Sequence, residues 1–279
     1  MALAVFSLPA PGSLQQLVLI QRHGERERLF KHQNLSESGI AGGAALTVAG
    51  LEHISSVGAA LRARYLAPDT CGVRCLAGEL GRGRWAAHEL HAQSSGLART
   101  LGTAEIMLSS LVPPAVRGGL PIPVYSRPDA EDFLLRGYAG GKCPMLTARL
   151  DEFRASARFG DKEDATRELR LAVGRALPSD WAEGSAEPHL DGGAVRLRDM
   201  WNAYDALETA PSPLVTDEML ARAEGLAAWL ESRSFGVLGG GALCGGALLA
   251  EVARRAAGAE QARLHYFSAH YPTMLCLLA

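Results

Sequence analysis

The residues best suited to chemistry in this sequence are a histidine and two arginines that follow an apolar run. Residues 17–20 are consecutive aliphatic side chains, a pattern typical of a strand buried on both faces. His23 follows this run, with Arg22 before it and Arg26 three residues later. Neutral imidazole, with a reference pKa of ~6.5, has a lone pair that can attack phosphorus. Because ligands gather beyond the carboxyl ends of strands in open α/β sheets, we expect a phosphate site here.

Two later segments also bring a cation to the end of a predicted strand. Residues 89–93 are strand-like, and the helical pattern that follows at 97–111 places Arg99 in its first turn. The amino end of a helix favours an anion, and a guanidinium adds paired hydrogen bonds. Residues 264–270 form another strand-like run that ends in His270. The sequence thus predicts one anion site built from two histidines and three arginines.

These segments resemble the histidine acid phosphatases, the second branch of the histidine phosphatase superfamily. The family signature Arg-His-Gly-x-Arg-x-Pro is matched at residues 22–28, with Arg28 in place of the proline. The pair at 99–100 is similar to the family's arginine-threonine pair, and residues 268–270 are similar to its last motif. Tyr271 stands where the family has an aspartate. Looser similarity occurs at residues 46–50, 61–65, 123–135 and 143–144.

The resemblance implies an α/β fold with a mostly parallel sheet flanked by helices, a phosphoglycerate-mutase-like core, and an inserted helical cap. We expect the core at residues 1–125 and 235–279 and the cap at 126–234. The sequence pattern agrees, since residues 144–233 are mostly helical in their apolar spacing. In the family such a cap covers the site and carries substrate specificity.

The resemblance also implies a reaction, the hydrolysis of a small phosphate ester. His23 would attack phosphorus and form a phosphohistidine that water then hydrolyses. Arg22, Arg26, Arg99 and His270 would neutralise the phosphoryl oxygens, supplying the charge that magnesium supplies at other phosphoryl-transfer sites. We therefore expect no metal and no cofactor.

Proton delivery is where the sequence departs from the family. The family's aspartate protonates the leaving oxygen, a role worth typically ~10²–10⁴-fold, whereas Tyr271 has a reference pKa of ~10. Pro272 predicts an extended backbone at Tyr271. Other candidate acids are carboxylates near the matched segments: Glu25, Asp129, Glu131 and Asp132.

Two hypotheses follow from that departure. In the first, the chain is a phosphatase with full or weakened activity, with Tyr271 as a third catalytic residue beside His23 and His270. In the second, it is a catalytically impaired pseudophosphatase that binds phosphorylated ligands. The chain also ends at Ala279, whereas family members usually continue well beyond the last histidine, so we expect their late elements to be absent.

Composition limits the partners and the location. With 279 residues, 48% hydrophobic, the chain can bury a large core. Its net charge of −2 argues against nucleic-acid binding, which needs clustered positive charge. No apolar run reaches the ~18 residues of a membrane span. The first residues lack the basic region of a signal peptide, so we expect a cytoplasmic location.

The cysteines leave a secretory or organellar location open. Five of them are too scattered for a disulfide-stapled fold, and the odd count leaves one free. The resemblance allows a local bridge between Cys71 and Cys75, because many family members carry disulfides. Asn34 begins a glycosylation acceptor that matters only in a secretory pathway.

Overall fold

The computed structural model describes residues 3–10, 13–27, 44–179, 181, 189–209, 212–236, 239–257 and 261–279. Arg28, at the proline position of the motif, lies outside the described residues. The glycosylation acceptor at Asn34 lies outside them as well.

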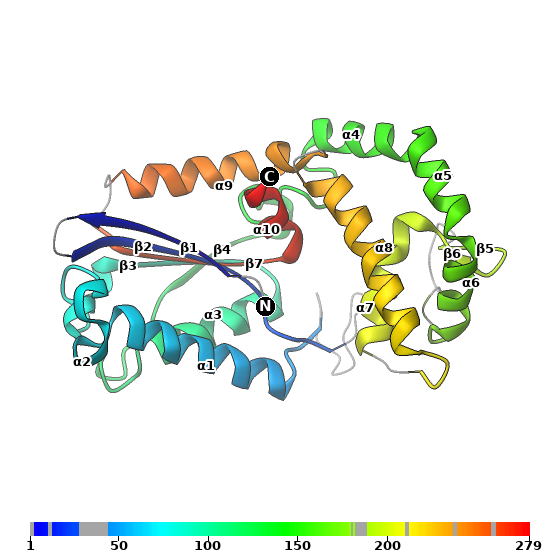
Figure 1. Cartoon of the computed structure of the whole chain (residues 1–279). Helices are drawn as coiled ribbons and strands as arrows, with labels where there is room; N and C mark the ends of the chain where they lie inside the picture. The colour runs from blue at the N-terminus through cyan, green and yellow to red at the C-terminus, as the bar shows by residue number, and fades with distance from the viewer. Residues whose placement is uncertain are drawn as a thin grey trace.

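A five-stranded sheet forms the centre of the structure, in the order β1-β2-β7-β3-β4 (Figure 1). Strands β2, β7, β3 and β4 run parallel, and β1 pairs antiparallel with β2 at one edge. The predicted mostly parallel sheet is confirmed; the sequence patterns did not indicate β1. The strands are β1 (Leu3–Ala10), β2 (Ser13–Arg22), β3 (Leu90–Ser95), β4 (Val124–Arg127) and β7 (Leu264–Ala269).

Helices cover both faces of this sheet (Figure 1). On one face, α1 (Val48–Tyr65) and α3 (Ala98–Leu111) bury an apolar core that includes Ile54, Met107 and Tyr266. On the other, α9 (Gly241–Ala256) and α10 (Tyr271–Leu278) pack with Phe267. The short helix α2 (Pro68–Cys71) follows α1.

Local sequence explains where two helices begin. The Thr47 hydroxyl accepts from the backbone N–H of Gly50 at 3.0 Å, which caps α1 as a threonine at this position should. Pro272 lies in the first turn of α10, where a proline needs no N–H partner. The prediction of extended backbone at Tyr271 is therefore wrong, because the proline begins a helix there.

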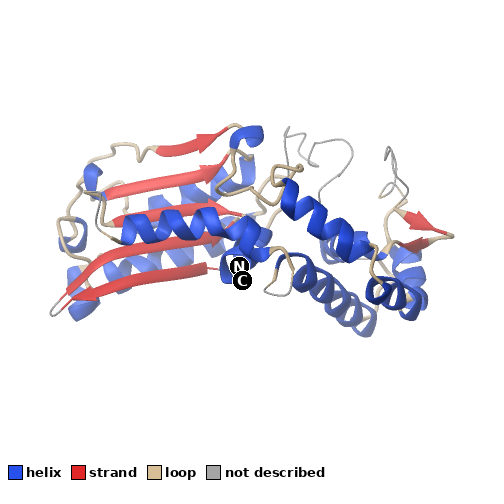
Figure 2. Ribbon diagram, turned by 90° about the horizontal axis from the view of Figure 1, so that it is seen from above, coloured by secondary structure: helices blue, strands red, loops and turns tan. Residues whose placement is uncertain are grey.

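The residues between β4 and α9 form a second cluster of helices beside the sheet (Figure 2). They pack around their own apolar core, which includes Val173, Met200, Tyr204 and Leu226. The elements are α4 (Pro144–Arg154), α5 (Ala157–Ala165), α6 (Arg167–Ala176), α7 (Met200–Thr209) and α8 (Asp217–Phe235), with a small ribbon of β5 (Leu190–Asp191) and β6 (Ala194–Val195).

The sheet register brings three strand ends together. In β2 and β7, Arg22 pairs with Ala269, and in β3 and β7, Ser94 pairs with Ser268. The central strand β7 thus lies between β2 and β3, with all three carboxyl ends at one edge. His23, His270 and the start of α3 follow directly from these ends, so the topology gathers the predicted site.

Within the described part of the chain, no helix combines the length and apolarity needed to cross a membrane.

Candidate active site

His23 is held by its backbone and by one ring nitrogen. Its backbone N–H donates to the Ala269 carbonyl at 3.0 Å, which extends the β2–β7 ladder past the strand end. Its Nδ1 lies 2.9 Å from the carbonyl oxygen of Gly24. A carbonyl only accepts hydrogen bonds, so Nδ1 carries the ring proton and Nε2 keeps the lone pair. The arrangement prepares Nε2 as a nucleophile.

The surroundings of His23 keep the ring neutral. The side chain is only 6% exposed. Burial, followed by the positive charges of Arg99 and Arg22, holds the pKa of His23 well below its ordinary value. Each factor disfavours the imidazolium form. His23 therefore keeps a free lone pair under acidic conditions that would protonate an exposed histidine.

Gly24 is required by close packing behind His23. Its N–H donates to the Thr103 hydroxyl of α3 at 3.0 Å. A Cβ at this position would lie 2.4 Å from Cδ1 of Ile54 and 3.2 Å from the carbonyl oxygen of Gly50. A larger residue would push α1 away from the loop that carries His23.

Three arginines, Arg22, Arg26 and Arg99, form what we term the arginine cluster. In the described part of the molecule, the Nε of each is buried without a hydrogen-bond partner. Burial and then Arg26 lower the pKa of Arg22, and the same two causes lower the pKa of Arg99 to about 10. Cations that repel one another and lack partners for buried donors are suited to an anion.

Arg26 already has one carboxylate partner. Its Nη2 lies 2.9 Å from both side-chain oxygens of Asp205 in α7. Its Nη1 donates to the Glu27 carbonyl at 2.9 Å. The motif predicted Arg26 as a phosphate ligand. The structure adds an acidic residue from the helical cluster that no sequence motif indicated.

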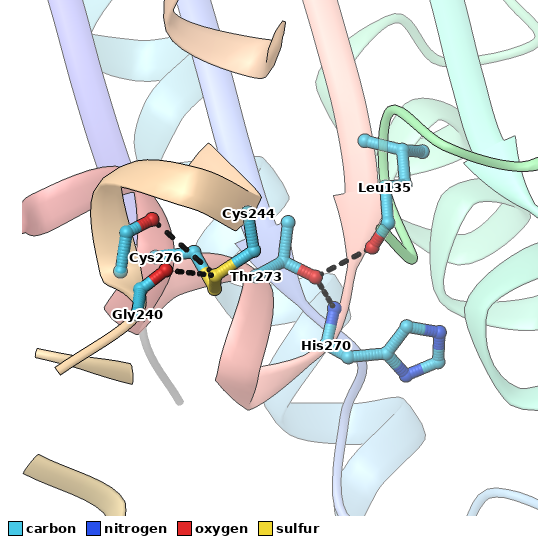
Figure 3. The surroundings of a disulfide bond; sticks show 7 residues. Leu135, Gly240, Cys244, His270, Thr273 and Cys276 are labelled. Carbon is cyan, nitrogen blue, oxygen red and sulfur yellow. Dashed lines mark hydrogen bonds between the residues drawn. A yellow bond between two sulfur atoms is a disulfide. The ribbon is translucent and has the colours of Figure 1, made fainter. Parts of the chain in front are cut away.

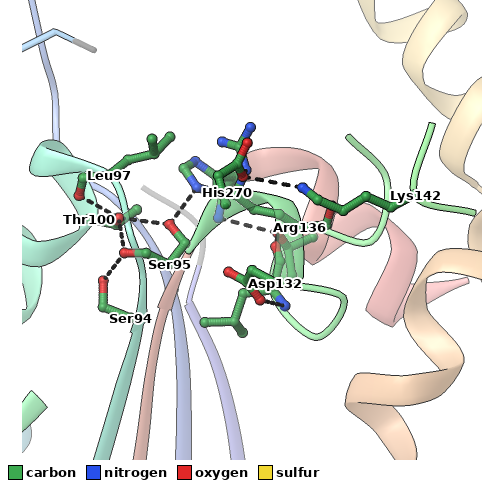
Figure 4. Close-up of polar contacts among 11 residues, drawn as sticks. Ser94, Ser95, Leu97, Thr100, Asp132, Arg136, Lys142 and His270 are labelled. Atoms are coloured by element: carbon green, nitrogen blue, oxygen red, sulfur yellow. Dashed lines mark hydrogen bonds and ion pairs between the residues drawn. The ribbon is translucent and has the colours of Figure 1, made fainter. Parts of the chain in front are cut away.

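His270 lies against His23 and is oriented by a chain of hydroxyls (Figure 4). The two ring centroids are 5.5 Å apart. His270 Nε2 is 2.7 Å from the Ser95 hydroxyl, which is 2.8 Å from the Thr100 hydroxyl. Thr100 donates to a backbone carbonyl, so Ser95 donates to Thr100 and accepts from His270 Nε2–H. Burial, then Arg99 and His23, hold the pKa of His270 well below its ordinary value.

The backbone at His270 is anchored by α10 (Figure 3). His270 N–H donates to the Thr273 hydroxyl at 3.3 Å, and that hydroxyl donates to the Leu135 carbonyl at 2.7 Å. Further along α10, Cys276 forms a disulfide with Cys244 of α9. These contacts fix the helix that begins directly after His270.

Two disulfides are present, one of them unexpected from the sequence. The bridge between Cys71 and Cys75 is confirmed. The scattered cysteines gave no sign of the bridge between Cys244 and Cys276, because 32 residues separate them and only packing of α9 on α10 brings them together. Cys143 is the free cysteine.

Arg136 is a further cation that the sequence reasoning missed. Its charge lowers the pKa of both His270 and Arg99. Its Nε lies 2.5 Å from Oδ1 of Asp129, which also pairs with Lys142 at 3.2 Å. The only signal in the sequence is its position directly after the loosely similar segment 123–135.

A cavity of about 660 Å³ opens in front of His23. The described residues that line it come from the β2–α1 segment and from α7. They are Arg22, His23, Gly24, Glu25, Arg26, Glu27, Thr47, Ala49, His53, Asp205, Glu208 and Thr209. Arg99 and His270, which lower the pKa of His23 or contact its ring, are not part of this lining, so they approach His23 from its buried side.

Tyr271 is packed between two side chains. Its ring stacks on Trp201 of α7, with centroids 4.8 Å apart and an interplanar angle of 6°, and the Arg22 guanidinium carbon lies 5.7 Å from its centroid. Burial, then the charge of Glu231, raises the pKa of Tyr271. These contacts position Arg22 and link α10 to the helical cluster.

The four alternative acids lie in different surroundings. Glu25 lines the cavity and accepts from the Thr47 hydroxyl at 2.8 Å. Asp129 is paired with cations, and the buried Asp132 accepts from the backbone N–H of Leu135 at 2.9 Å. Glu131 is exposed. Among these four, Glu25 is the acid that borders the cavity.

With this geometry in place, known proteins provide a comparison. No protein-family model matches the sequence. A lysosomal acid phosphatase from Xenopus laevis is 25% identical over 205 residues, covering 70% of this chain and 41% of the relative, so the chain spans about two fifths of that protein. A Klebsiella phytase is similar in structure, with a TM-score of 0.66 and 14% identity over 95% of this chain and 72% of its own.

A multiple inositol polyphosphate phosphatase from Bifidobacterium longum, solved with inositol hexasulfate, is similar with a TM-score of 0.56 and 14% identity, over 97% of this chain and 76% of its own. The histidines and arginines at the carboxyl edge of the sheet therefore lie on a fold that this chain shares with these phosphatases. In sequence, the chain is similar to the lysosomal acid phosphatase, and its motifs resemble those of the histidine acid phosphatases.

The predicted cytoplasmic location is wrong. The curated relative is named a lysosomal acid phosphatase. The two disulfides agree with this correction, since disulfides persist in oxidising compartments and are rare in the cytosol.

Proposed function

We propose that this chain hydrolyses small phosphate monoesters through a phosphohistidine formed at Nε2 of His23. The observation that carries the proposal is the orientation of His23, whose Nδ1 donates to Gly24 while the ring borders the cavity. In the first step Nε2 bonds to phosphorus and the ester P–O bond breaks. Water then attacks the phosphohistidine, releasing phosphate and the free ring.

The arginine cluster, His270 and Arg136 neutralise the phosphoryl oxygens in this proposal. Among the described residues, the buried Nε of each arginine in the cluster lacks a partner, so these three donors are free to bind an anion. Asp205 partly neutralises the charge of Arg26. Phosphate binding would add negative charge beside His270 and favour its protonated form, which could then donate to a phosphoryl oxygen.

Proton delivery to the leaving oxygen has two candidate donors. Tyr271 occupies the sequence position of the family's aspartate, but it packs on Trp201 and its pKa is raised. Glu25 borders the cavity and carries a carboxyl group. We propose that turnover proceeds with weak acid assistance, so esters with good leaving groups should react fastest.

We also propose the division into an α/β core, residues 1–125 and 235–279, and a helical cap, residues 126–234. Asp205, Glu208 and Thr209 of α7 supply one wall of the cavity, which supports a role for the cap in recognising the alcohol part of the ester. The disulfides support folding in an oxidising compartment, such as the route to the lysosome named for the Xenopus relative.

The direct test is to trap the intermediate. Wild-type protein mixed with ³²P-labelled p-nitrophenyl phosphate and quenched in base should retain label on His23, stable in base and labile in acid. Turnover without any trapped label would contradict the covalent mechanism. Binding of phosphate without turnover of any ester would instead support the pseudophosphatase.

A second test addresses the proton donor. Tyr271→Asp should raise kcat/KM for an alkyl phosphate relative to an aryl phosphate near pH 5, because only the poorer leaving group needs a proton. Tyr65→Asp is unsuitable as a control, since Tyr65 is buried in the core; Tyr125→Asp, at an exposed edge strand, serves instead. An unchanged ratio in a folded Tyr271→Asp protein would show that the residue at position 271 does not limit proton delivery to the leaving group.

A further inference from the structure

The cavity in front of His23 has an unusual charge for a phosphate site. Four carboxylates are among its described lining residues. Glu27 is one of them, and the other three are Glu25 after β2 and Asp205 and Glu208 in α7. We term Glu25, Asp205 and Glu208 the acidic wall. Of the three arginines that lower the pKa of His23, Arg22 and Arg26 are among the described lining residues and Arg99 is not.

The members of the acidic wall differ in their described partners. Asp205 is occupied by Arg26. Glu25 accepts a hydrogen bond from Thr47, and Glu208 accepts one from the Tyr204 hydroxyl at 3.4 Å. Among the residues that the structure describes, neither Glu25 nor Glu208 forms an ion pair. Both side chains are exposed in the cavity lining, and the charge of Glu208 also acts on Arg22, whose pKa it raises.

The position of the phosphate fixes what these carboxylates can meet. Arg26 is only 9% exposed, lines the cavity and has a buried Nε without a partner among the described residues. A phosphoryl group bound there, beside His23, leaves the remainder of the cavity for the alcohol part of the ester. That part lies between Thr47 and His53 of the α1 side and Glu208 of α7.

We propose that the site selects phosphate monoesters whose alcohol carries an ammonium group, and disfavours esters with further anionic groups close to the reacting phosphate. This inference rests on the proposed function, because it places the phosphate at His23. An ammonium group near Glu25 and Glu208 gains two attractions, whereas a second phosphate or carboxylate in the same place is repelled. Both the attraction and the repulsion should be modest, because these carboxylates are exposed and exposed charge pairs are weak.

The test uses phosphonates, whose P–C bond is not hydrolysed, so binding is measured apart from turnover. 2-Aminoethylphosphonate, propylphosphonate and 2-carboxyethylphosphonate have similar size and differ in the charge at the far end. Calorimetry at pH 7 and low salt should give about threefold to tenfold tighter binding for the ammonium ligand than for the neutral one, and weaker binding for the carboxylate. High salt should reduce these differences.

Variants separate the acidic wall from the ligands' own chemistry. In Glu208→Gln and in Glu25→Gln, the preference for 2-aminoethylphosphonate over propylphosphonate should fall about twofold to threefold. The ratio of the two affinities is compared between wild type and each variant, so the intrinsic differences between the two phosphonates cancel. Glu52→Gln, an exposed glutamate of α1 that is not part of the lining, is the matched control and should keep the wild-type ratio.

The outcomes distinguish this inference from the proposed function. Equal binding of all three phosphonates, binding of none, or ratios that stay unchanged in both glutamine variants would overturn the inference. Turnover of p-nitrophenyl phosphate reports on the proposed function alone. Turnover with no ammonium preference removes only the substrate class, and an ammonium preference without turnover leaves a selective binding site that does not hydrolyse.

Discussion

The two sides of His23 differ in charge and in origin. On the buried side, Arg99 and His270 follow neighbouring strands of the sheet, and the charge of Arg99 lowers the pKa of the His23 ring. On the open side, Asp205 and Glu208 come from α7 in a separate apolar cluster. The buried side is cationic, which suits the phosphoryl group that every substrate would share. The open side is acidic and built by another part of the chain.

This difference separates reactivity from selectivity in the proposed enzyme. Residues at the strand ends are fixed by the sheet register, so they can hold a transition state with little freedom. Residues on α7 approach the same histidine from the helical cluster, which has its own apolar core, so their side chains can be substituted without altering the sheet. Substitutions on the two sides should therefore have different effects, and the following predictions are ordered from the largest.

Replacing the nucleophile should have the largest effect. His23→Ala should lower kcat/KM for p-nitrophenyl phosphate by about 10³-fold or more, because no other group supplies the attacking lone pair. Steady-state rates measure the loss, with circular dichroism to check folding. His88→Ala, which removes an exposed histidine outside the cavity, should retain activity. Residual activity within tenfold of wild type would show that His23 is not the nucleophile.

Helix α8 contains a buried carboxyl group whose pKa is raised by burial. Glu231 in α8 is 7% exposed, its Oε2 has no partner among the described residues, and burial raises its pKa to about 7. Below the ordinary pKa near 4.5, the carboxyl is protonated in both the folded and unfolded chain. Between that pH and 7, the unfolded chain loses its proton first, so the folded state is destabilised by about 3 kcal/mol.

Glu231→Gln should remove this pH dependence. The free energy of unfolding of the variant should match wild type near pH 4 and exceed it by about 3 kcal/mol near pH 8. Urea titrations at the two pH values measure the difference, and Glu224→Gln, exposed on the same helix, is the control. Parallel profiles for Glu231→Gln and wild type would mean that the carboxyl is ionised in the folded protein.

Removing an arginine from the buried side should weaken the binding of inorganic phosphate. Arg99→Ala should reduce the affinity for inorganic phosphate by about 1.5–3 kcal/mol, the value of charge-assisted hydrogen bonds. Calorimetry gives the dissociation constant. Arg82→Ala is the control, because Arg82 is 66% exposed and pairs with Glu79 far from the site. An unchanged constant for Arg99→Ala would remove Arg99 from the phosphate site.

An open-side substitution should have the smallest effect and the opposite sign. Asp205→Asn removes a negative charge and frees Nη2 of Arg26, so phosphate should bind about threefold to tenfold more tightly. Asp151→Asn provides a matched control, since Asp151 also pairs with an arginine but lies on α4. Weaker phosphate binding in Asp205→Asn would show that Asp205 orients Arg26 rather than competing with phosphate.

Short-range features could be predicted because their causes lie within a few residues. The Thr47 cap depends on a hydrogen bond across three residues, and the strand that precedes His23 depends on consecutive apolar side chains. The placement of Arg99 in the first turn of α3 follows from helical spacing. Pro272 shows the limit of such rules, because one proline restricts its predecessor in a loop but is well accommodated in the first turn of α10.

By itself, the sequence determined the mostly parallel sheet, the helices next to it and the histidines and arginines that end its strands. Only the tertiary structure decided that Asp205 pairs with Arg26 across 179 residues, that Arg136 lowers the pKa of His270, and that Cys244 meets Cys276. A hydrophobic period or a cap is set by local backbone geometry. A contact between distant segments depends on how whole helices pack, and no single stretch of sequence contains that information.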